Sequence, residues 1–187
     1  MKKKIYLFVS ILLLTNIVNA KFVLTPYDGL KTPDGVYTIM REGSTVEQNY
    51  KAMISAVKMA IPNVTIREFE QEQYITVMAE TTVKLKFKDV FTQSKKFNVS
   101  YVLKINAEKE KITLDFEQLG NFTISKFGSH YTLYPTIGRN NAALQSSGLI
   151  HVFNSSGETT QEETKKEIEE WANTIVSQIE IMLKEMK

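Results

Sequence analysis

The 187-residue chain contains no cysteine, only 4 proline and 8 glycine residues, and 2 histidines. The absence of cysteine excludes a disulfide scaffold, a thiol nucleophile and the common cysteine-based zinc sites. The small number of glycine and proline residues excludes a collagen-like chain. Hydrophobic residues make up 43% of the chain and aromatic residues 10%, which is too much apolar content for a disordered segment. The composition is therefore that of an ordinary globular protein.

The first twenty residues have the three zones of a secretory signal peptide. Lysines at positions 2 to 4 precede an apolar run over residues 5–14, and Val18, Asn19 and Ala20 occupy the positions that a signal peptidase reads. We expect cleavage after Ala20. A retained membrane anchor is the alternative, but the apolar run is about half of the roughly 20 residues that a spanning helix needs. The pattern predicts a periplasmic or secreted protein with no transmembrane segment after signal cleavage.

Removal of this leader changes the charge of the protein. The mature chain of 167 residues carries 20 Lys and Arg against 21 Asp and Glu, so its net charge is −1. A positive field suited to nucleic acid is therefore absent, and export carries the protein away from DNA, so we expect no nucleic-acid partner. A chain of this length buries roughly 70% of its unfolded surface without help from a metal. We expect residues 21–187 to form a single domain with no cofactor.

Two segments have the periodicity of amphipathic helices. The first begins at Ser44, which is placed to form a capping box with Glu47, and it ends before Pro62. The second begins near Thr160, with Glu163 as its box partner, and occupies residues 160–187. Each helix has one apolar stripe and one polar face, so each should cover one side of a sheet.

Between these helices the periodicity changes to two, which is typical of strands buried on one face. The alternation is clearest at residues 83–88, 97–105 and 112–116, and further strands are predicted at 36–40, 64–69, 74–79, 131–134 and 149–153. One-sided burial favours an antiparallel sheet. The predicted fold is α+β, a curved antiparallel sheet with both helices packed on one face, with a less regular region at residues 118–158.

Several stretches resemble a known family. They are FVLTPYDG at residues 22–29, YTI at 37–39, GSTVEQNY at 43–50, and YVLKIN through KITLDF at 101–116. They are similar to a family of uncharacterised secreted domains common in Bacteroidetes, whose fold resembles that of the TATA-binding protein. The resemblance covers roughly residues 22–117 and consists of apolar, turn and capping residues. It implies a TBP-like or helix-grip-like fold and an extracytoplasmic location, and it supplies no catalytic residues.

No phosphate-binding loop, dinucleotide fingerprint, nucleophile elbow or zinc-protease motif occurs in the chain. His130 and His151 could meet as a base or a two-imidazole metal site if strands 131–134 and 149–153 pair; otherwise each is a polar strand residue facing water. Asp115 and Glu117 face the same way about 7 Å apart, a spacing that some glycosidases use. The alternative is charge pairing with lysines of neighbouring strands, such as Lys104. We expect no enzyme and no metal site.

Three sets of residues are candidates for binding. The first is a lysine row on the polar sheet face, and the second lies in the loop at residues 136–147. The third would line a cavity for a small apolar ligand between the sheet and the terminal helix, since methionine and aromatic side chains adapt to such guests; the alternative is that it is ordinary core. These sets are Lys84, Lys86 and Lys88; Arg139, Asn140 and Asn141; and Tyr50, Met53, Tyr101, Trp171 and Met182.

The leading hypothesis is an exported, non-catalytic binding or interaction module of the bacterial cell envelope, whose partner is an unknown envelope protein. The alternative is a carrier of a small hydrophobic ligand held between the sheet and the terminal helix. An envelope hydrolase is the third hypothesis, and it has the least support because no catalytic motif is present.

Overall fold

The computed structural model describes residues 22–86, 94–126, 129–137 and 149–186. The elements follow in the order β1 (Val23–Thr25), β2 (Gly29–Lys31), β3 (Tyr37–Met40), α2 (Val46–Ala60), β4 (Thr65–Phe69), a short 3₁₀ turn (Glu70–Glu72), β5 (Tyr74–Leu85), β6 (Lys95–Glu108), β7 (Lys111–Leu119), β8 (Phe122–Lys126), β9 (Ser129–Tyr134), β10 (Leu149–His151) and α3 (Glu162–Glu185). Strands β1 and β2 form a separate hairpin, and the other eight strands form one sheet.

The centre of the sheet is the long pair of β5 and β6, which runs from Tyr74 opposite Asn106 to Leu85 opposite Lys95. Strand β4 pairs with the first half of β5, while β7 and β8 share the other edge of β6. Strand β3 pairs with β7, and β9 joins β8 to β10. The pairing of β9 with β10 is parallel and the other pairs are antiparallel, so the sheet is mostly antiparallel.

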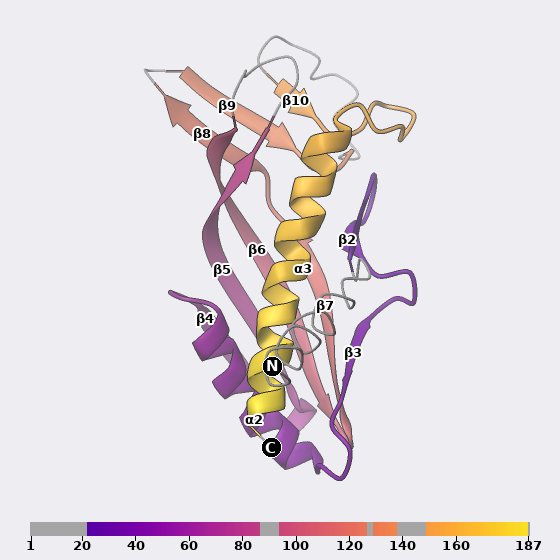
Figure 1. The fold of residues 1–187 in the computed structure, drawn as a ribbon, viewed down its shortest axis with the longest axis vertical. Coiled ribbons are helices and arrows are strands. Elements are labelled where there is room, and N and C mark those ends of the chain that lie inside the picture. The colour runs from indigo at the N-terminus through magenta and orange to yellow at the C-terminus, as the bar shows by residue number, and fades with distance from the viewer. Residues whose placement is uncertain (1–21, 87–93, 127–128, 138–148, 187) are drawn as a thin grey trace, which may run out of the picture.

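One face of this sheet is buried under both helices. Figure 1 shows α3 running along the length of the sheet, with α2 at one end of it. Alternate side chains of β6 supply the centre of the core, and each of them exposes at most 2% of its surface: Phe97, Val99, Tyr101, Leu103 and Ile105. Alternation places these side chains on one face, and burial of that face is the main source of stability. The predicted α+β fold, with two helices on one face of a curled sheet, is confirmed.

Both helices begin later than predicted. Thr45 caps α2 and forms a capping box with Gln48, because the Ser44 hydroxyl donates to the carbonyl of Arg41 in the preceding turn. Helix α3 begins at Glu162 without a side-chain cap. The Thr160 hydroxyl donates to the carbonyls of His151, at the end of β10, and of Val152, and it makes no capping bond to the helix. In both places a hydroxyl that could cap a helix bonds to a turn instead.

The strand predictions were wrong in several details. Two separate strands were predicted at 74–79 and 83–88. In the structure, β5 is continuous from Tyr74 to Leu85, since Glu80 to Thr82 also pair with β6. Strands β1, β2 and β8 were not predicted, and β8 lies in the region at residues 118–158 that was expected to be less regular. Strands β6 and β7 extend beyond the predicted segments 97–105 and 112–116, since Glu108 still pairs with Lys111 across the turn. Parallel pairing of β10 was also missed, because side-chain alternation carries no information about strand direction.

Helix α3 is fastened to the sheet by polar contacts along its length. Near its start, Glu163 forms an ion pair with Lys86 at 2.7 Å. Towards its end, Glu180 accepts a hydrogen bond from the hydroxyl of Tyr37 at 2.5 Å, and the Leu183 carbonyl accepts one from Arg41 at 2.8 Å. Burial and the neighbouring carboxylate raise the pKa of Tyr37, so this hydroxyl remains a donor at neutral pH.

The middle of α3 holds the first strand. The Asn173 side chain accepts the N–H of Phe22 at 2.8 Å and donates to the Phe22 carbonyl at 3.1 Å, while Glu169 accepts the N–H of Leu24 at 2.9 Å. The Phe22 ring is fully buried and lies edge-on to Phe116, with 5.0 Å between ring centres. The amide of Asn173 thus takes the place of a neighbouring strand for Phe22.

Replacing Asn173 with alanine should lower the free energy of unfolding by about 1–3 kcal/mol, because the buried N–H and carbonyl of Phe22 lose their partners. The matched control is Thr174→Ala, an exposed neighbour on the same helix, whose effect should stay within about 0.5 kcal/mol. Urea unfolding of both variants measures the difference. Equal stability of the two variants would show that Asn173 does not hold the first strand.

Candidate functional site

The face of the sheet turned away from α2 and α3 carries the outward side chains of the central strands. Along β5 these are the even-numbered residues from Tyr74 to Lys84, and along β6 those from Lys96 to Glu108. Most are polar and at least partly exposed, in contrast to the buried odd-numbered residues between them. We call this surface the outer face. It is the polar sheet face that the sequence predicts as a working surface.

A groove of about 670 Å³ is hollowed into the outer face. A volume of this size is in the range of small-molecule and peptide-side-chain sites. Its lining comes from the α2–β4 connection and from four strands, β4, β5, β6 and β7. The residues are Asn63, Thr65, Met78, Ala79, Glu80, Ser100, Tyr101, Val102 and Gln118.

Five polar side chains of the groove are not engaged by the fold. Within the part of the chain that the structure describes, none of them has a side-chain hydrogen bond or an ion pair; they are Asn63, Thr65, Glu80, Ser100 and Gln118. Together they offer two amides, two hydroxyls and one carboxylate. Met78 and Val102, which are register partners and partly buried, provide an apolar strip between them. The groove therefore has free hydrogen-bonding capacity, one negative charge and one apolar contact surface.

The local backbone gives this part of the outer face its shape. The register between β6 and β7 shifts between Val102 and Leu103, so that β7 has an extra residue there. Just beyond, the N–H of Gly120 donates to the carbonyl of Ser100 at 2.8 Å. A Cβ atom at Gly120 would meet that same carbonyl oxygen at 2.8 Å, so only glycine fits this close approach. The bulge and the glycine together let β7 leave β6 beside the groove.

Most other charges of the outer face are already paired. Asp115 bonds to Lys31 at 3.0 Å, and Glu117 lies 4.0 Å from Lys104. The Lys104 ammonium also lies 4.4 Å from the ring centre of Tyr74. Asp115 and Glu117 are thus engaged in charge pairing, which was the alternative to acid–base chemistry; Lys31 was not foreseen as a partner, because β2 belongs to a hairpin that the sequence does not reveal.

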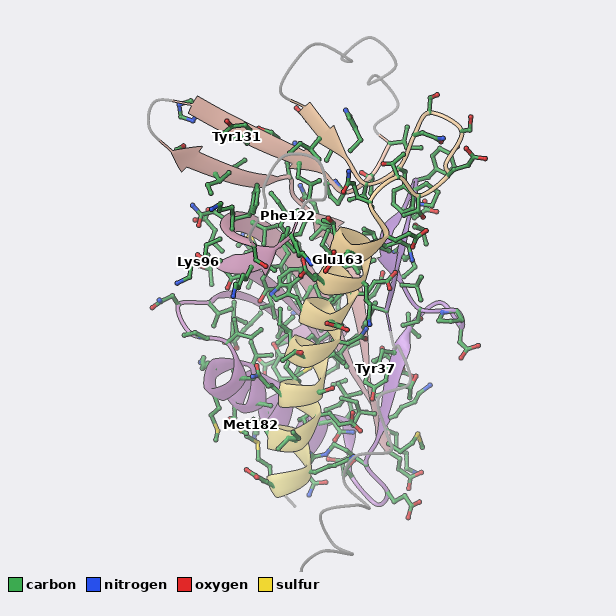
Figure 2. All side chains as sticks on the ribbon, turned by 45° about the horizontal axis from the view of Figure 1, so that its top comes forward. Tyr37, Lys96, Phe122, Tyr131, Glu163 and Met182 are labelled. Carbon is green, nitrogen blue, oxygen red and sulfur yellow. The ribbon has the colours of Figure 1, made fainter. Side chains whose placement is uncertain are left out.

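The lysine row predicted on the polar face is divided in the structure. Lys84 lies on the outer face, but Lys86 follows the end of β5 and points to α3, where its N–H donates to Glu167 at 2.6 Å in addition to the ion pair with Glu163. Figure 2 shows Glu163 near the start of α3 and Lys96 at the edge of the molecule. Lys88 lies outside the described residues, as do the loop candidates Arg139, Asn140 and Asn141.

The five side chains predicted to line an apolar cavity belong to the core or pack against it: Tyr50, Met53, Tyr101, Trp171 and Met182. Met53, Tyr101 and Tyr50 expose 0%, 2% and 6% of their surface, so all three are buried. Trp171 lies edge-on to Tyr101, with 5.3 Å between ring centres. Burial raises the pKa of Tyr101 to about 12. The described positions of all five side chains therefore match the ordinary-core alternative.

The two histidines do not meet. Strands β9 and β10 do pair, as the histidine hypothesis required, but the register sets His151 opposite Tyr134. His130 is four residues farther along β9, or about 13 Å at the usual rise of a strand. The His151 ring stacks on Tyr134 at 5.1 Å, and His130 shares a hydrogen bond with Ser125 at 2.8 Å. In the described ranges, no group of three or more His, Cys, Asp or Glu side chains could hold a metal ion.

A second hollow of about 740 Å³ lies along the outward side of α3, with lining residues between Lys166 and Ile181. Its described lining comes from one helix, and it includes Asn173, which is committed to Phe22. The groove on the outer face is therefore the better candidate site.

None of the described helices is long and apolar enough to cross a membrane.

Two solved structures of bacterial proteins are similar to this chain. A DUF4468 family protein from Bacteroides ovatus superposes with a TM-score of 0.56 at 11% identity, over 79% of this chain and 84% of that one. A TBP-like protein from Parabacteroides distasonis gives a TM-score of 0.46 at 12% identity, over 77% of this chain and 90% of that one. No protein-family model and no curated protein matches the chain. The fold shared with the DUF4468 family protein confirms, at the level of the fold, the resemblance to an uncharacterised Bacteroidetes family that the sequence indicated.

Burial lowers the pKa of His151, so the folded protein favours the neutral ring. The unfolded chain binds a proton more readily, and the contribution of His151 to stability is therefore present above about pH 6.5 and lost as the pH falls below it. The free energy of unfolding, measured with urea, should fall less between pH 7.5 and pH 5 for His151→Phe than for the unchanged protein. An imidazole titration by NMR with a midpoint at or above 6.5 would contradict this expectation.

Proposed function

We propose that this chain is an exported, non-catalytic binding module of the cell envelope, and that its partner binds at the groove of the outer face. The observation that carries the proposal is the set of five groove side chains whose hydrogen-bonding groups are not used by the fold. These five side chains are exposed, and they gather in one hollow beside an apolar strip, so a ligand that enters the hollow meets several hydrogen-bonding groups at once.

The two faces of the sheet differ in how far the fold already uses them, and this difference supports the same function. The inner face is fully used by packing against α2 and α3, so a partner would have to displace core side chains to bind there. The outer face requires no such rearrangement, because its side chains are exposed or partly exposed already. Binding at a preformed surface avoids the ordering cost that weakens association.

A non-catalytic role is supported by the chemistry of the candidate residues. The two histidines are held apart, Asp115 is paired with Lys31, and Glu80 is the only carboxylate among the described residues that line the groove. General acid–base catalysis normally needs two positioned groups. Export is supported by the three zones of the leader, whose expected cleavage point lies one residue before Phe22, the first residue held by Asn173.

A photoreactive side chain at position 102, in the groove, should form one recurring crosslinked product in intact cells of the source bacterium. This product should be recovered from the envelope, and this protein's part of it should begin at Lys21. The same group at Lys109, in the exposed turn between β6 and β7, is the matched control and should not give that product. The groove-filling variant Ser100→Trp should remove it. Identical products from both positions, or a product that persists in Ser100→Trp, would refute the groove as the binding surface.

A further inference from the structure

The outer face carries an ordered series of residue pairs that begins in the groove and continues past it along β5 and β6. Four successive register pairs of β5 and β6 follow one another along the ladder, each separated from the next by two residues: Met78 with Val102, Glu80 with Ser100, Thr82 with Asn98, and Lys84 with Lys96. Both residues of each of the last three pairs are exposed, and those of the first pair are partly exposed. The series therefore runs from apolar to acidic to neutral polar to basic along one line.

The two charged steps of this series lack counter-charges. Glu80 has no cation as a partner, and neither Lys84 nor Lys96 has an acidic partner, among the residues that the structure describes. Lys84 and Lys96 are directly opposite each other, an arrangement of like charges that disfavours the pairing of the two strands. The neutral pair, which lies between the acidic and the basic pair, has a hydrogen bond of its own, since the Thr82 hydroxyl donates to Asn98 at 3.1 Å.

The spacing of these charges matches that of an extended polypeptide. Four residues separate Glu80 from Lys84, which corresponds to about 13 Å at the usual rise of a strand. In any extended chain, side chains at every second position point to the same side and keep the same rise. A partner segment lying along β5 and β6 would therefore place one side chain over each of the four pairs.

We infer that the outer face binds an extended segment of a partner polypeptide whose alternate residues are apolar, basic, neutral polar and acidic, in that order. The apolar residue contacts Met78 and Val102, and the basic residue extends to Glu80 in the groove. The neutral residue faces Thr82 and Asn98, and the acidic residue lies between Lys84 and Lys96. This inference rests on the proposed function and adds the chemistry of the partner. Charge complementarity of this kind selects the partner and its direction along the face.

The test uses the mature protein, residues 21–187, and two fluorescent peptides. The first peptide has Leu, Lys, Thr and Glu at alternate positions with Ser between them, and the second has the Lys and Glu exchanged. Fluorescence anisotropy at low and at physiological salt should show binding of the first peptide and at least about tenfold weaker binding of the second. The difference in affinity between the two peptides should become smaller with added salt, because the charges are exposed and salt screens them.

Charge reversal provides the decisive control. The variant carrying Glu80→Lys, Lys84→Glu and Lys96→Glu should prefer the exchanged peptide, and circular dichroism with thermal unfolding verifies that it is folded. Equal affinity for both peptides, or an unchanged preference in the variant, would overturn the inference. If neither peptide binds while Val102 still crosslinks a partner in cells, the partner chemistry is wrong and the groove remains the binding surface. If the crosslink is also absent, both proposals fail.

Discussion

The alternation of side chains along β5 and β6 is the constraint on which the rest of the structure depends. Twelve consecutive register pairs join these strands, so a shift by one residue would turn every buried side chain to water. Leu103 and Ile105 are fully buried on the inner face, while Ser100 and Asn98 are exposed on the outer face. The same pairing therefore builds the core and presents the candidate binding surface, and neither can change without the other.

Polar contacts fix the parts that hydrophobic packing alone leaves undetermined. Asn173 anchors the backbone of Phe22, and the ion pair of Lys86 with Glu163 joins the end of β5 to the start of α3. Gly120 allows β7 and β8 to share one edge of β6. Because the helices use only the inner face, the opposite face is left to hydroxyls, amides and unpaired charges. A domain built in this way can bind a partner without any change in its core.

The sequence predicts those features that depend on periodicity. Both helices, strands β6 and β7 and the helix-covered sheet face follow from apolar residues at regular spacing. It does not predict contacts that depend on distant chain segments, such as Lys31 with Asp115 or Asn173 with Phe22. The groove was missed as a set of residues for the same reason, since Asn63 and Gln118 come together only through the sheet register. A polar sheet face was foreseen, but its hollow and its charge order were not.

Cysteine labelling tests the central claim most directly, because the chain has no cysteine of its own. Single replacements at Asn98 and Ser100, on the outer face, should react with a maleimide in the purified native protein as fast as in the unfolded chain, to within about tenfold. Replacements at the buried neighbours Val99 and Ala107 should react only after unfolding. Protection of Asn98→Cys and Ser100→Cys in the native protein, or rapid labelling of Val99→Cys, would contradict a sheet with one covered and one open face.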